Sequence, residues 1–359
     1  MSSEPTSANR PRRRAYTTHD PAVDTRLAAI VGQVEDPRDR QLILEMMITA
    51  YRFGSDRAST GDLKIVTSAI KELRYAFKIF RPYRHLRKVA VFGSARVSRS
   101  HPAYGEARRF GRLIAAAGWS VITGAASGIM RAGHEGAGLT ASFGLNIRLP
   151  FEQEANPVIA KDIKLVTCKY FFTRKLLFIK ESHATALFPG GFGTLDEGFE
   201  SLTLVQTGKS DPRPIVFVDQ PGGRYWDPLL KFLLRRMPRH RMISPQECAL
   251  VQVARSAEEA ARQILEFYRV YHSQRYVGEV LSIRLQQPLP ETAIGRLSHE
   301  FRDILSRGEF RQGPALPQEA DEPELAHLPR LLFAFNRRSF GRLVQLVHRI
   351  NALGPRPPR

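Results

Sequence analysis

Two spacings of apolar residues alternate through the middle of the chain. Short continuous apolar runs, such as KVAVF at 88–92 and ATALF at 184–188, have the length and composition of buried strands. Between them, apolar residues recur every three or four positions, which predicts amphipathic helices. Apolar strands that alternate with helices predict an α/β fold, a Rossmann-like doubly wound parallel sheet with helices on both faces. The predicted strands are 88–92, 119–123, 142–149, 164–168, 184–188, 214–218 and 250–253, and the predicted helices are 103–118, 128–140, 170–183, 194–207, 225–237 and 256–271.

The pattern changes on both sides of this region and predicts four segments. Residues 1–20 are basic and lack an apolar run, so we expect a disordered tail. Residues 21–84 have helical periodicity and predict a helical N-terminal extension. Residues 85–271 hold the parallel sheet, and residues 272–359 predict a small α/β domain. In that last domain we expect a strand at 275–285, a helix at 291–306, a loop at 307–324, a strand at 329–335 and a helix at 340–353.

Three glycine-rich loops follow predicted strands: FGSAR at 92–96, TGAASGIM at 123–130 and PGGFGT at 189–194. Ligands bind beyond the carboxyl ends of the strands in an open parallel sheet, and these loops all lie there. Glycine lets the backbone approach an anion closely, and a helix N-terminus presents unpaired N–H groups. None of the loops is a G-x-G-x-x-G or P-loop motif, so a tight turn explains each one separately. Three at one edge favour a site for a phosphate-bearing ligand.

Thr194 and Glu197 also match the S/T-x-x-E capping box of a helix N-terminus. In that interpretation Thr194 caps the helix, Glu197 returns the hydrogen bond, and no ligand is needed; such a cap contributes about 1 kcal/mol. It leaves the three glycines of the third loop without a role. A bound anion at the same helix N-terminus accounts for them, and Asp196 and Glu197 would then flank the anion.

The stretch PGGFGTLDE at 189–197 resembles the PGGxGTxxE motif of the LOG (Lonely Guy) family. FGSAR, GIM, ASFGLNIRLPFEQEAN, YFFTRKLLF and LTLVQTGK occur in the order and at the spacing of that family, so the resemblance covers roughly 88–270. Members are phosphoribohydrolases that release cytokinin bases from nucleoside 5′-monophosphates. The resemblance implies a LOG-type nucleotide-binding catalytic domain, a homodimer or higher homo-oligomer, and no cofactor.

The resemblance also implies which residues act. Arg174 in FFTRKLLF and Glu197 in GTLDE correspond to the essential catalytic pair of the family. One loop departs from the family pattern, because many members read GGGPGIM where this chain reads GAASGIM, with Ala125 and Ala126 in place of glycines. The implied substrate-binding residues are Gly93, Ser94, Lys175, Gly190, Gly191, Gly193, Thr194 and Asp196.

The chemistry of these side chains supports a mechanism. Cleaving an N-glycosidic bond builds positive charge on the ribose, which the Glu197 carboxylate would stabilise while it orients water. The planar guanidinium of Arg174 suits the base, the ribose hydroxyls or the phosphate, although its spacing is equally typical of an exposed helix charge. Glu152, Gln153 and Asn156 follow the third predicted strand, where base or ribose contacts are expected. The predicted reaction is hydrolysis of AMP or a cytokinin riboside monophosphate to a free base and ribose 5-phosphate.

Two alternatives to the hydrolase are a lysine decarboxylase and a non-catalytic binding protein. Sequences of this family are often labelled lysine decarboxylase, a chemistry that uses pyridoxal phosphate as a Schiff base on a lysine. Lys175 and Lys180 lie on a predicted helix without an evident cofactor pocket, so the residues do not favour it. The other alternative is a non-catalytic protein that binds a phosphorylated nucleotide or cofactor, as molybdenum cofactor carriers do. The retained Arg174 and Glu197 favour the enzyme.

The composition of the chain indicates which binding partners and which cellular compartment to expect. The formal net charge of +19 favours an anionic partner but is equally typical of an arginine-rich surface. No aromatic stacking pattern, helix-turn-helix or zinc finger favours nucleic acid, and no apolar run approaches the ~20 residues of a membrane span. Cys168 and Cys248 form no CxxC pair, so we expect neither a metal site nor a disulfide, and a reducing cytoplasm fits best.

Overall fold

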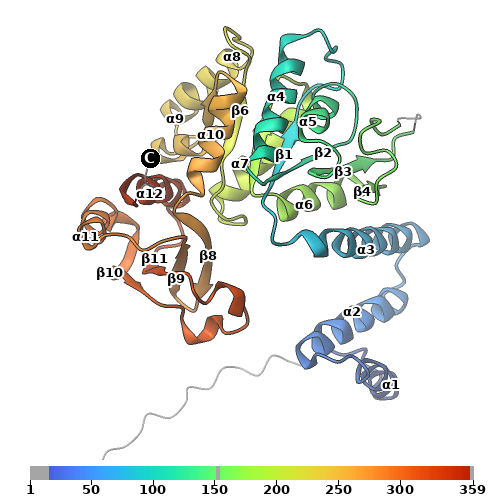
Figure 1. Cartoon of the computed structure of the whole chain (residues 1–359). Coiled ribbons are helices and arrows are strands. Elements are labelled where there is room, and N and C mark those ends of the chain that lie inside the picture. The colour runs from blue at the N-terminus through green and yellow to red at the C-terminus, as the bar shows by residue number, and fades with distance from the viewer. Residues whose placement is uncertain (1–15, 151–153, 356–359) are drawn as a thin grey trace, which may run out of the picture. The chain divides into compact units, whose positions relative to one another are not determined.

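The computed structural model describes residues 16–150 and 154–355 (Figure 1). Glu152 and Gln153, two of the expected substrate contacts, lie outside the described residues, as does most of the predicted basic tail. The chain divides into two compact units, residues 1–71 and 72–359. Within the described residues, no helix combines the length and the apolar character that a bilayer crossing requires.

The first unit is helical, as its periodicity predicts. It contains α1 (Pro21–Val31), α2 (Pro37–Ser55) and the first half of α3 (Thr60–Phe80). Proline occupies the first position of α1 and of α2, where its missing N–H costs nothing. The side chains of Asp20 and Asp36 accept hydrogen bonds from the next backbone amides and so cap the two helices.

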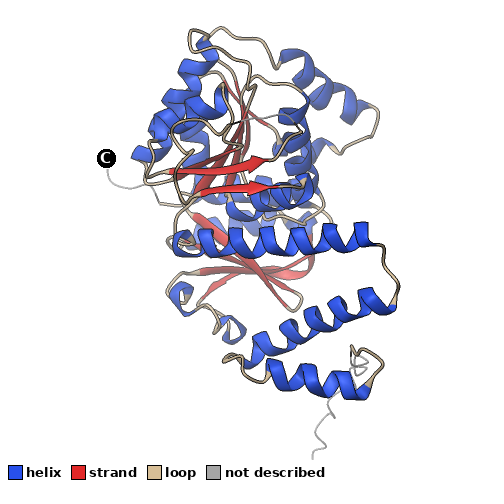
Figure 2. Ribbon diagram, turned by 90° about the vertical axis from the view of Figure 1, so that its right-hand side faces the viewer, coloured by secondary structure: helices blue, strands red, loops and turns tan. Residues whose placement is uncertain are grey.

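The second unit is built on a seven-stranded parallel sheet with the strand order β4-β3-β2-β1-β5-β6-β7. Figure 2 draws its strands in red and the surrounding helices in blue. β1, β2, β3, β5 and β6 are buried along their whole length, which explains why they read as continuous apolar runs. The predicted Rossmann-like α/β fold is therefore confirmed. The strands are β1 (Lys88–Phe92), β2 (Ser120–Thr123), β3 (Ser142–Ile147), β4 (Leu165–Cys168), β5 (Ala184–Leu187), β6 (Ile215–Val218) and β7 (Gln252–Ala254).

Helices cover both faces of this sheet. On one face, α4 (Pro102–Ala116) packs against α5 (Ile129–Ala137) and α10 (Ala257–Phe267). On the other, α6 (Phe171–Glu181) contacts β3 and β4, and α7 (Phe192–Gln206) contacts β5 and β6. The two faces follow from the chain path, because it runs outward from β1 through β2 in one direction and through β5 and β6 in the other.

That reversal of strand order at β1 creates the crevice in which ligands of such sheets bind. The chain leaves β1 toward β2 on one side, while β5 pairs with β1 on the other side. The loops at the carboxyl ends of β1 and β5 therefore diverge and leave space between them. After β6 the chain forms α8 (Asp227–Lys231), a π-helical turn (Phe232–Arg236) and α9 (Met237–Arg239), where one helix is predicted.

The C-terminal part carries a four-stranded antiparallel sheet with the order β10-β11-β9-β8. Its strands are β8 (Tyr271–Val277), β9 (Val280–Leu285), β10 (Leu305–Gly313) and β11 (Arg330–Phe335), and its helices are α11 (Glu291–Glu300) and α12 (Phe340–Leu353). The single strand predicted at 275–285 is wrong, because Gly278 adopts a φ of +61° and turns the chain into a hairpin. The loop predicted at 307–324 is wrong in its first half, which is β10; its largely exposed residues hide the strand pattern.

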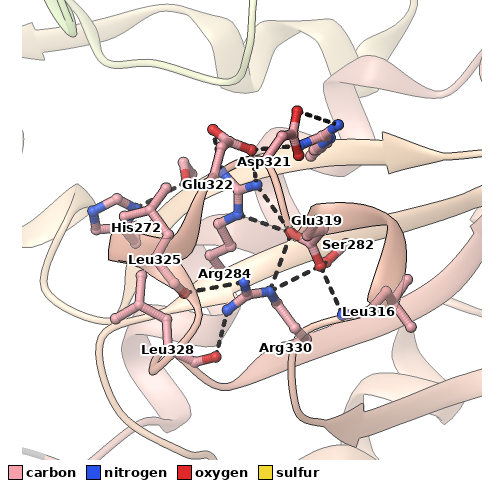
Figure 3. Close-up of polar contacts among 12 residues, drawn as sticks. His272, Ser282, Arg284, Leu316, Glu319, Asp321, Glu322, Leu325, Leu328 and Arg330 are labelled. Carbon is pink, nitrogen blue, oxygen red and sulfur yellow. Dashed lines mark hydrogen bonds and ion pairs between the residues drawn. The ribbon is translucent and has the colours of Figure 1, made fainter.

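A buried ionic network holds the segment after β10 against this sheet (Figure 3). The carboxylate of Glu319 accepts hydrogen bonds from Arg284 at 2.9 Å and from Arg330 at 3.1 Å, and all three side chains are buried. Arg330 also donates to the carbonyls of Leu325, at 3.0 Å, and Leu328. Glu319 thus pairs with two buried guanidinium groups, of which Arg284 also pairs with Glu322, and ties them to a segment of two short 3-10 helices, Pro317–Glu319 and Pro323–Leu325.

Replacing Glu319 by Gln should therefore destabilise the protein. The substitution removes the carboxylate that pairs with the buried Arg330, whereas Arg284 keeps Glu322 as a partner. Removing one partner of a buried pair costs about 3–5 kcal/mol. The melting temperature of Glu319→Gln should fall by at least several degrees. Glu309→Gln is the matched control on β10, because the Glu309–Arg311 pair is 3.9 Å apart and exposed. Equal melting temperatures for the two variants would show that the network is not stabilising.

Candidate functional site

The three glycine loops meet at the carboxyl edge of the parallel sheet. The N–H of Ser94 donates to the carbonyl of Pro189 at 3.0 Å, and the N–H of Ile129 donates to the carbonyl of Ser94 at 3.1 Å. The loop after β1 is thus joined by main-chain hydrogen bonds to the loops after β5 and β2. The structure brings together the three segments that the sequence places at one edge.

The glycines of these loops have two different roles. A Cβ on Gly93 would lie 2.5 Å from Ile129, and one on Gly190 would lie 2.1 Å from Thr194 Oγ1 and 2.9 Å from the amide nitrogen of Ser94, so packing within and between the loops requires both glycines. Gly191 and Gly193 differ, since a Cβ on either would meet no protein atom within 4 Å. Protein packing therefore explains the first pair of glycines but leaves the second pair unexplained.

A cavity of about 720 Å³ opens beside Gly191 and Gly193. It is lined by all three glycine loops, by Arg174 and Phe178 of α6, and by Glu197 of α7. Its volume lies within the range of small-molecule sites, which is about 300–1,000 Å³. The space that Gly191 and Gly193 leave open is part of this cavity.

The helix α7 begins at this cavity, two residues earlier than predicted. Its N-cap is Gly191, whose lack of a side chain leaves the first turn without a side-chain cap. The capping-box interpretation of Thr194 and Glu197 is therefore wrong. The amides of Phe192 and Gly193, the first two of the helix, have no helical acceptor, and both residues line the cavity. This helix end presents donors and partial positive charge to a ligand.

Glu197 and Arg174 face each other across the base of the cavity. Arg174 Nη2 lies 3.8 Å from Glu197 Oε1, and the two side chains are 15% and 4% exposed. Glu197 Oε1 and Arg174 Nε are buried, and neither has a hydrogen-bond partner among the described residues. Burial raises the pKa of Glu197 to about 7, although Lys175 and Arg174 oppose the shift. A ligand that entered the cavity would find a carboxylate and a guanidinium with unused hydrogen-bonding capacity.

Aromatic rings hold the guanidinium of Arg174 in place. Its Cζ lies 4.9 Å from the ring centre of Phe171 and 5.9 Å from that of Phe178. Burial lowers the pKa of Arg174, and Glu197 counteracts that effect. The alternative that Arg174 is an exposed helix charge is therefore wrong.

Lys175 and Asp196 lie beside the cavity and do not line it. Lys175 Nζ is 2.7 Å from Glu200, 3.0 Å from Asp196 and 3.6 Å from Glu197 Oε2. Burial alone would lower the pKa of Lys175, but the hydrogen bonds to Glu200 and Asp196 outweigh it and raise the pKa. A Schiff base with pyridoxal phosphate needs a neutral amine, so this lysine does not fit that cofactor.

Asn156 lies beneath the second loop and holds its backbone. Its Nδ2 donates to the carbonyls of Ala125 at 3.0 Å and Ala126 at 3.2 Å, and its own N–H donates to Ala125 at 2.7 Å. Ala125 has a φ of +60°, a conformation that favours glycine. The buried amide of Asn156 therefore stabilises the loop in which alanines replace the glycines of the family pattern, and it does not line the cavity.

Nine of the described residues that line the cavity were not predicted as site residues, and Arg96, Met130, Phe192 and Tyr225 are among them. Arg96 and Met130 lie in the glycine loops, and Phe192 lies inside the PGGxGTxxE motif, so motif position could have indicated them. Tyr225 follows β6 and has no sequence signal; its hydroxyl donates to the carbonyl of Gly190 at 2.6 Å. Phe192 is 94% exposed, so its ring is free to contact a ligand.

Two comparisons with known proteins find matches to parts of this chain. Residues 122–264 match the model of the family described as possible lysine decarboxylase. The curated protein "Cytokinin riboside 5′-monophosphate phosphoribohydrolase LOG3" of Arabidopsis thaliana is 32% identical over 94 residues. That match spans 26% of this chain and 42% of LOG3.

Solved structures with a similar fold have lower sequence identity to this chain. A molybdenum cofactor binding protein from Rippkaea orientalis has 21% identity and a TM-score of 0.36, and covers 50% of this chain and 94% of its own. The molybdenum cofactor carrier protein from Chlamydomonas reinhardtii has 19% identity and a TM-score of 0.35, and covers 50% of this chain and 98% of its own. These scores are too low to bear on function. The family-model match and the LOG3 match are both in line with the resemblance of the central α/β domain to the LOG family, and the chain spans less than half the length of LOG3.

Proposed function

We propose that the protein hydrolyses the N-glycosidic bond of a nucleoside 5′-monophosphate and releases a free base and ribose 5-phosphate. The observation that carries the proposal is the pair of Arg174 and Glu197. Each has a buried polar atom without a hydrogen-bond partner among the described residues, and both line the cavity at the start of α7. Leaving such atoms unsatisfied costs free energy that a bound substrate would recover.

The substrate phosphate would bind at the N-terminus of α7. The amides of Phe192 and Gly193 are available there, and the missing side chains of Gly191 and Gly193 leave room for the anion beside the backbone. Arg96, which also lines the cavity, adds positive charge on the opposite loop. With the phosphate held at the helix end, the ribose would extend toward Glu197.

Glu197 would act on the sugar. As the C1′–N bond breaks, its electrons move to the base and positive charge develops on the ribose ring, which the carboxylate stabilises. Water then forms the new bond to C1′ and loses a proton, which Glu197 can accept because its pKa of about 7 is suited to proton transfer near neutral pH. The leaving base gains one proton, so the reaction consumes one water and needs no other reactant.

Arg174 would hold the substrate in register with Glu197. Its guanidinium has a fixed planar geometry, and its Nε is unpartnered among the described residues. Lys175 and Asp196 would act from beside the cavity, where Lys175 keeps a positive charge 3.6 Å from Glu197.

The name of LOG3 points to cytokinin riboside 5′-monophosphates as one substrate class, and AMP is the simplest adenine ribotide to test. The homodimer or higher homo-oligomer, and a cytoplasmic location, remain predictions from the family resemblance and the composition. A non-catalytic carrier of a phosphorylated ligand is the competing function, and it predicts binding of AMP without release of adenine.

Glu197→Gln tests the catalytic role directly. The amide keeps the size of the side chain but can neither stabilise the cationic ribose nor accept a proton, so adenine release from AMP should fall at least ~100-fold. Melting temperatures identify any loss of fold. Glu200→Gln, one turn further along α7 and outside the cavity, should lose less than ~10-fold. Adenine release by Glu197→Gln close to the wild-type rate would exclude the assigned role.

The pH dependence follows from the raised pKa of Glu197. The carboxylate is the active form, so kcat/KM for AMP should increase as pH rises through about 7, where Glu197 loses its proton. The phosphate of AMP has a second pKa of about 6, and its titration would also change kcat/KM with pH. The residual activity of Glu197→Gln is the control, because it should retain only the substrate titration. An unchanged profile in that variant would assign the titration to another group.

Alanine substitutions in the third loop separate packing from ligand binding. Gly193→Ala should leave the melting temperature unchanged or slightly raised, and Gly191→Ala should lower it only slightly, through the poorer N-cap, because the new methyl groups meet no protein atom. They should raise the KM for AMP at least ~10-fold, about 1.4 kcal/mol, because the methyl groups occupy the phosphate site. Gly190→Ala should instead lower the melting temperature, since its Cβ would lie 2.1 Å from Thr194 Oγ1. Wild-type KM values for the first two variants would place the phosphate elsewhere.

A further inference from the structure

A second, smaller cavity lies at the opposite edge of the parallel sheet. It has a volume of about 230 Å³ and forms where the end of α6, the loop before β6 and the start of β8 come together. Arg213, His183, Tyr271 and Asp211 line it. None of these residues belongs to the first cavity, and the proposed hydrolysis uses none of them.

Arg213 is a buried cation that lacks a carboxylate partner. Its residue is 6% exposed, and its guanidinium donates to the carbonyl of Ile179 at 3.2 Å and to Ser182 Oγ at 3.3 Å, both neutral groups. No carboxylate of the described residues forms an ion pair with it within 4.0 Å. The buried arginines of Figure 3 differ, because Glu319 neutralises them. Asp211, on the same cavity, acts on Arg213 only electrostatically, and burial still lowers the pKa of Arg213. A buried guanidinium without a direct carboxylate contact is costly, and an anion bound in this cavity would reduce that cost.

His183 offers a second donor. Its Nδ1 accepts the backbone N–H of Lys88 at 3.2 Å, so the ring hydrogen is on Nε2, which has no acceptor among the described residues. Burial, reinforced by the charges of Arg87, Arg213, Lys88 and His272, lowers the pKa of His183 to about 3. The ring is therefore a neutral N–H donor at physiological pH, and the groups that perturb it make the surroundings positive.

Tyr271 offers a third donor. The residue is 1% exposed, and its hydroxyl forms no hydrogen bond with any described residue. Burial raises its pKa well above the usual value, so the hydroxyl keeps its proton. A hydroxyl that donates to no described residue, on the same cavity as the Arg213 guanidinium, is available to a polar ligand.

One carboxylate also lines the cavity and restricts the type of anion. Asp211 Oδ1 accepts a hydrogen bond from Gln274 Nε2 at 3.2 Å, and burial raises the pKa of Asp211. A fully deprotonated oxyanion would be repelled by this group. Hydrogen phosphate retains an O–H that can donate to Asp211, while its other oxygens accept from Arg213, His183 and Tyr271.

We propose that this cavity is a binding site for inorganic phosphate, held by the guanidinium of Arg213, the Nε2–H of His183 and the hydroxyl of Tyr271. The volume of about 230 Å³ suits a single phosphate and lies below the roughly 300 Å³ at which sites for larger organic ligands begin. The site is independent of the proposed hydrolysis, because it would bind phosphate whether or not the first cavity is catalytic.

The test is isothermal titration of inorganic phosphate into the full chain and four variants. Tyr271→Phe removes only a hydroxyl without a protein partner, so it should fold normally and weaken phosphate binding at least ~5-fold. Arg213→Met should weaken it at least ~10-fold, since it removes the charge of the site. Tyr276→Phe is the matched control, because Tyr276 is on the same strand with a buried, unpartnered hydroxyl but does not line the cavity.

Gly193→Ala, the fourth variant, separates the two cavities, because its methyl group would occupy the phosphate site at the start of α7. Binding that persists in Gly193→Ala and Tyr276→Phe and weakens in Tyr271→Phe supports the proposal. Binding that disappears in Gly193→Ala and is unchanged in Tyr271→Phe would place phosphate in the first cavity only and overturn it. The absence of phosphate binding to the wild-type chain would overturn it as well. Should Arg213→Met fail to fold, Tyr271→Phe against Tyr276→Phe still decides the outcome.

Discussion

The main-chain hydrogen bonds of Ser94 are the constraint on which the candidate site depends. Its amide is bonded to the loop after β5 and its carbonyl to the loop after β2, so three crossovers of the sheet end at one point. Main chains approach this closely only where side chains are absent, which is why Gly93 and Gly190 flank the contacts. The arrangement fixes the N-terminus of α7, and with it the direction from which Glu197 enters the cavity.

Buried charged side chains have three different kinds of partner in this chain. Glu319 neutralises two arginines and leaves the C-terminal sheet with a satisfied network. Arg174 and Glu197 lie at ion-pair distance without a hydrogen bond, and each retains an unused polar atom. Arg213 has neutral partners only. The first arrangement stabilises the fold. The other two leave buried polar groups without a charged hydrogen-bond partner, which costs stability and is common at binding sites.

The two cavities are connected through the same helices. α6 carries Arg174 near its first turn and ends beside the second cavity at Ser182, and α7 starts at the first cavity and leads into the loop that contains Arg213. The parallel sheet places helix N-termini at one edge and helix C-termini at the other, so each of these helices spans the sheet between the cavities. Ligands at the two sites would therefore contact opposite ends of the same two elements.

The periodicity of apolar residues was sufficient to predict the parallel sheet and its helices, because burial on both faces leaves an unbroken apolar run in each strand. It failed at the hairpin around Gly278 and at β10, where exposed polar residues carry no such signal. The motif located the glycine loops but could not show that Gly190 serves packing while Gly191 faces empty space. That distinction, like the position of Asn156 under the second loop and the hydrogen bonds of Arg213 to neutral groups, depends on atoms that are distant in the chain and meet only after folding.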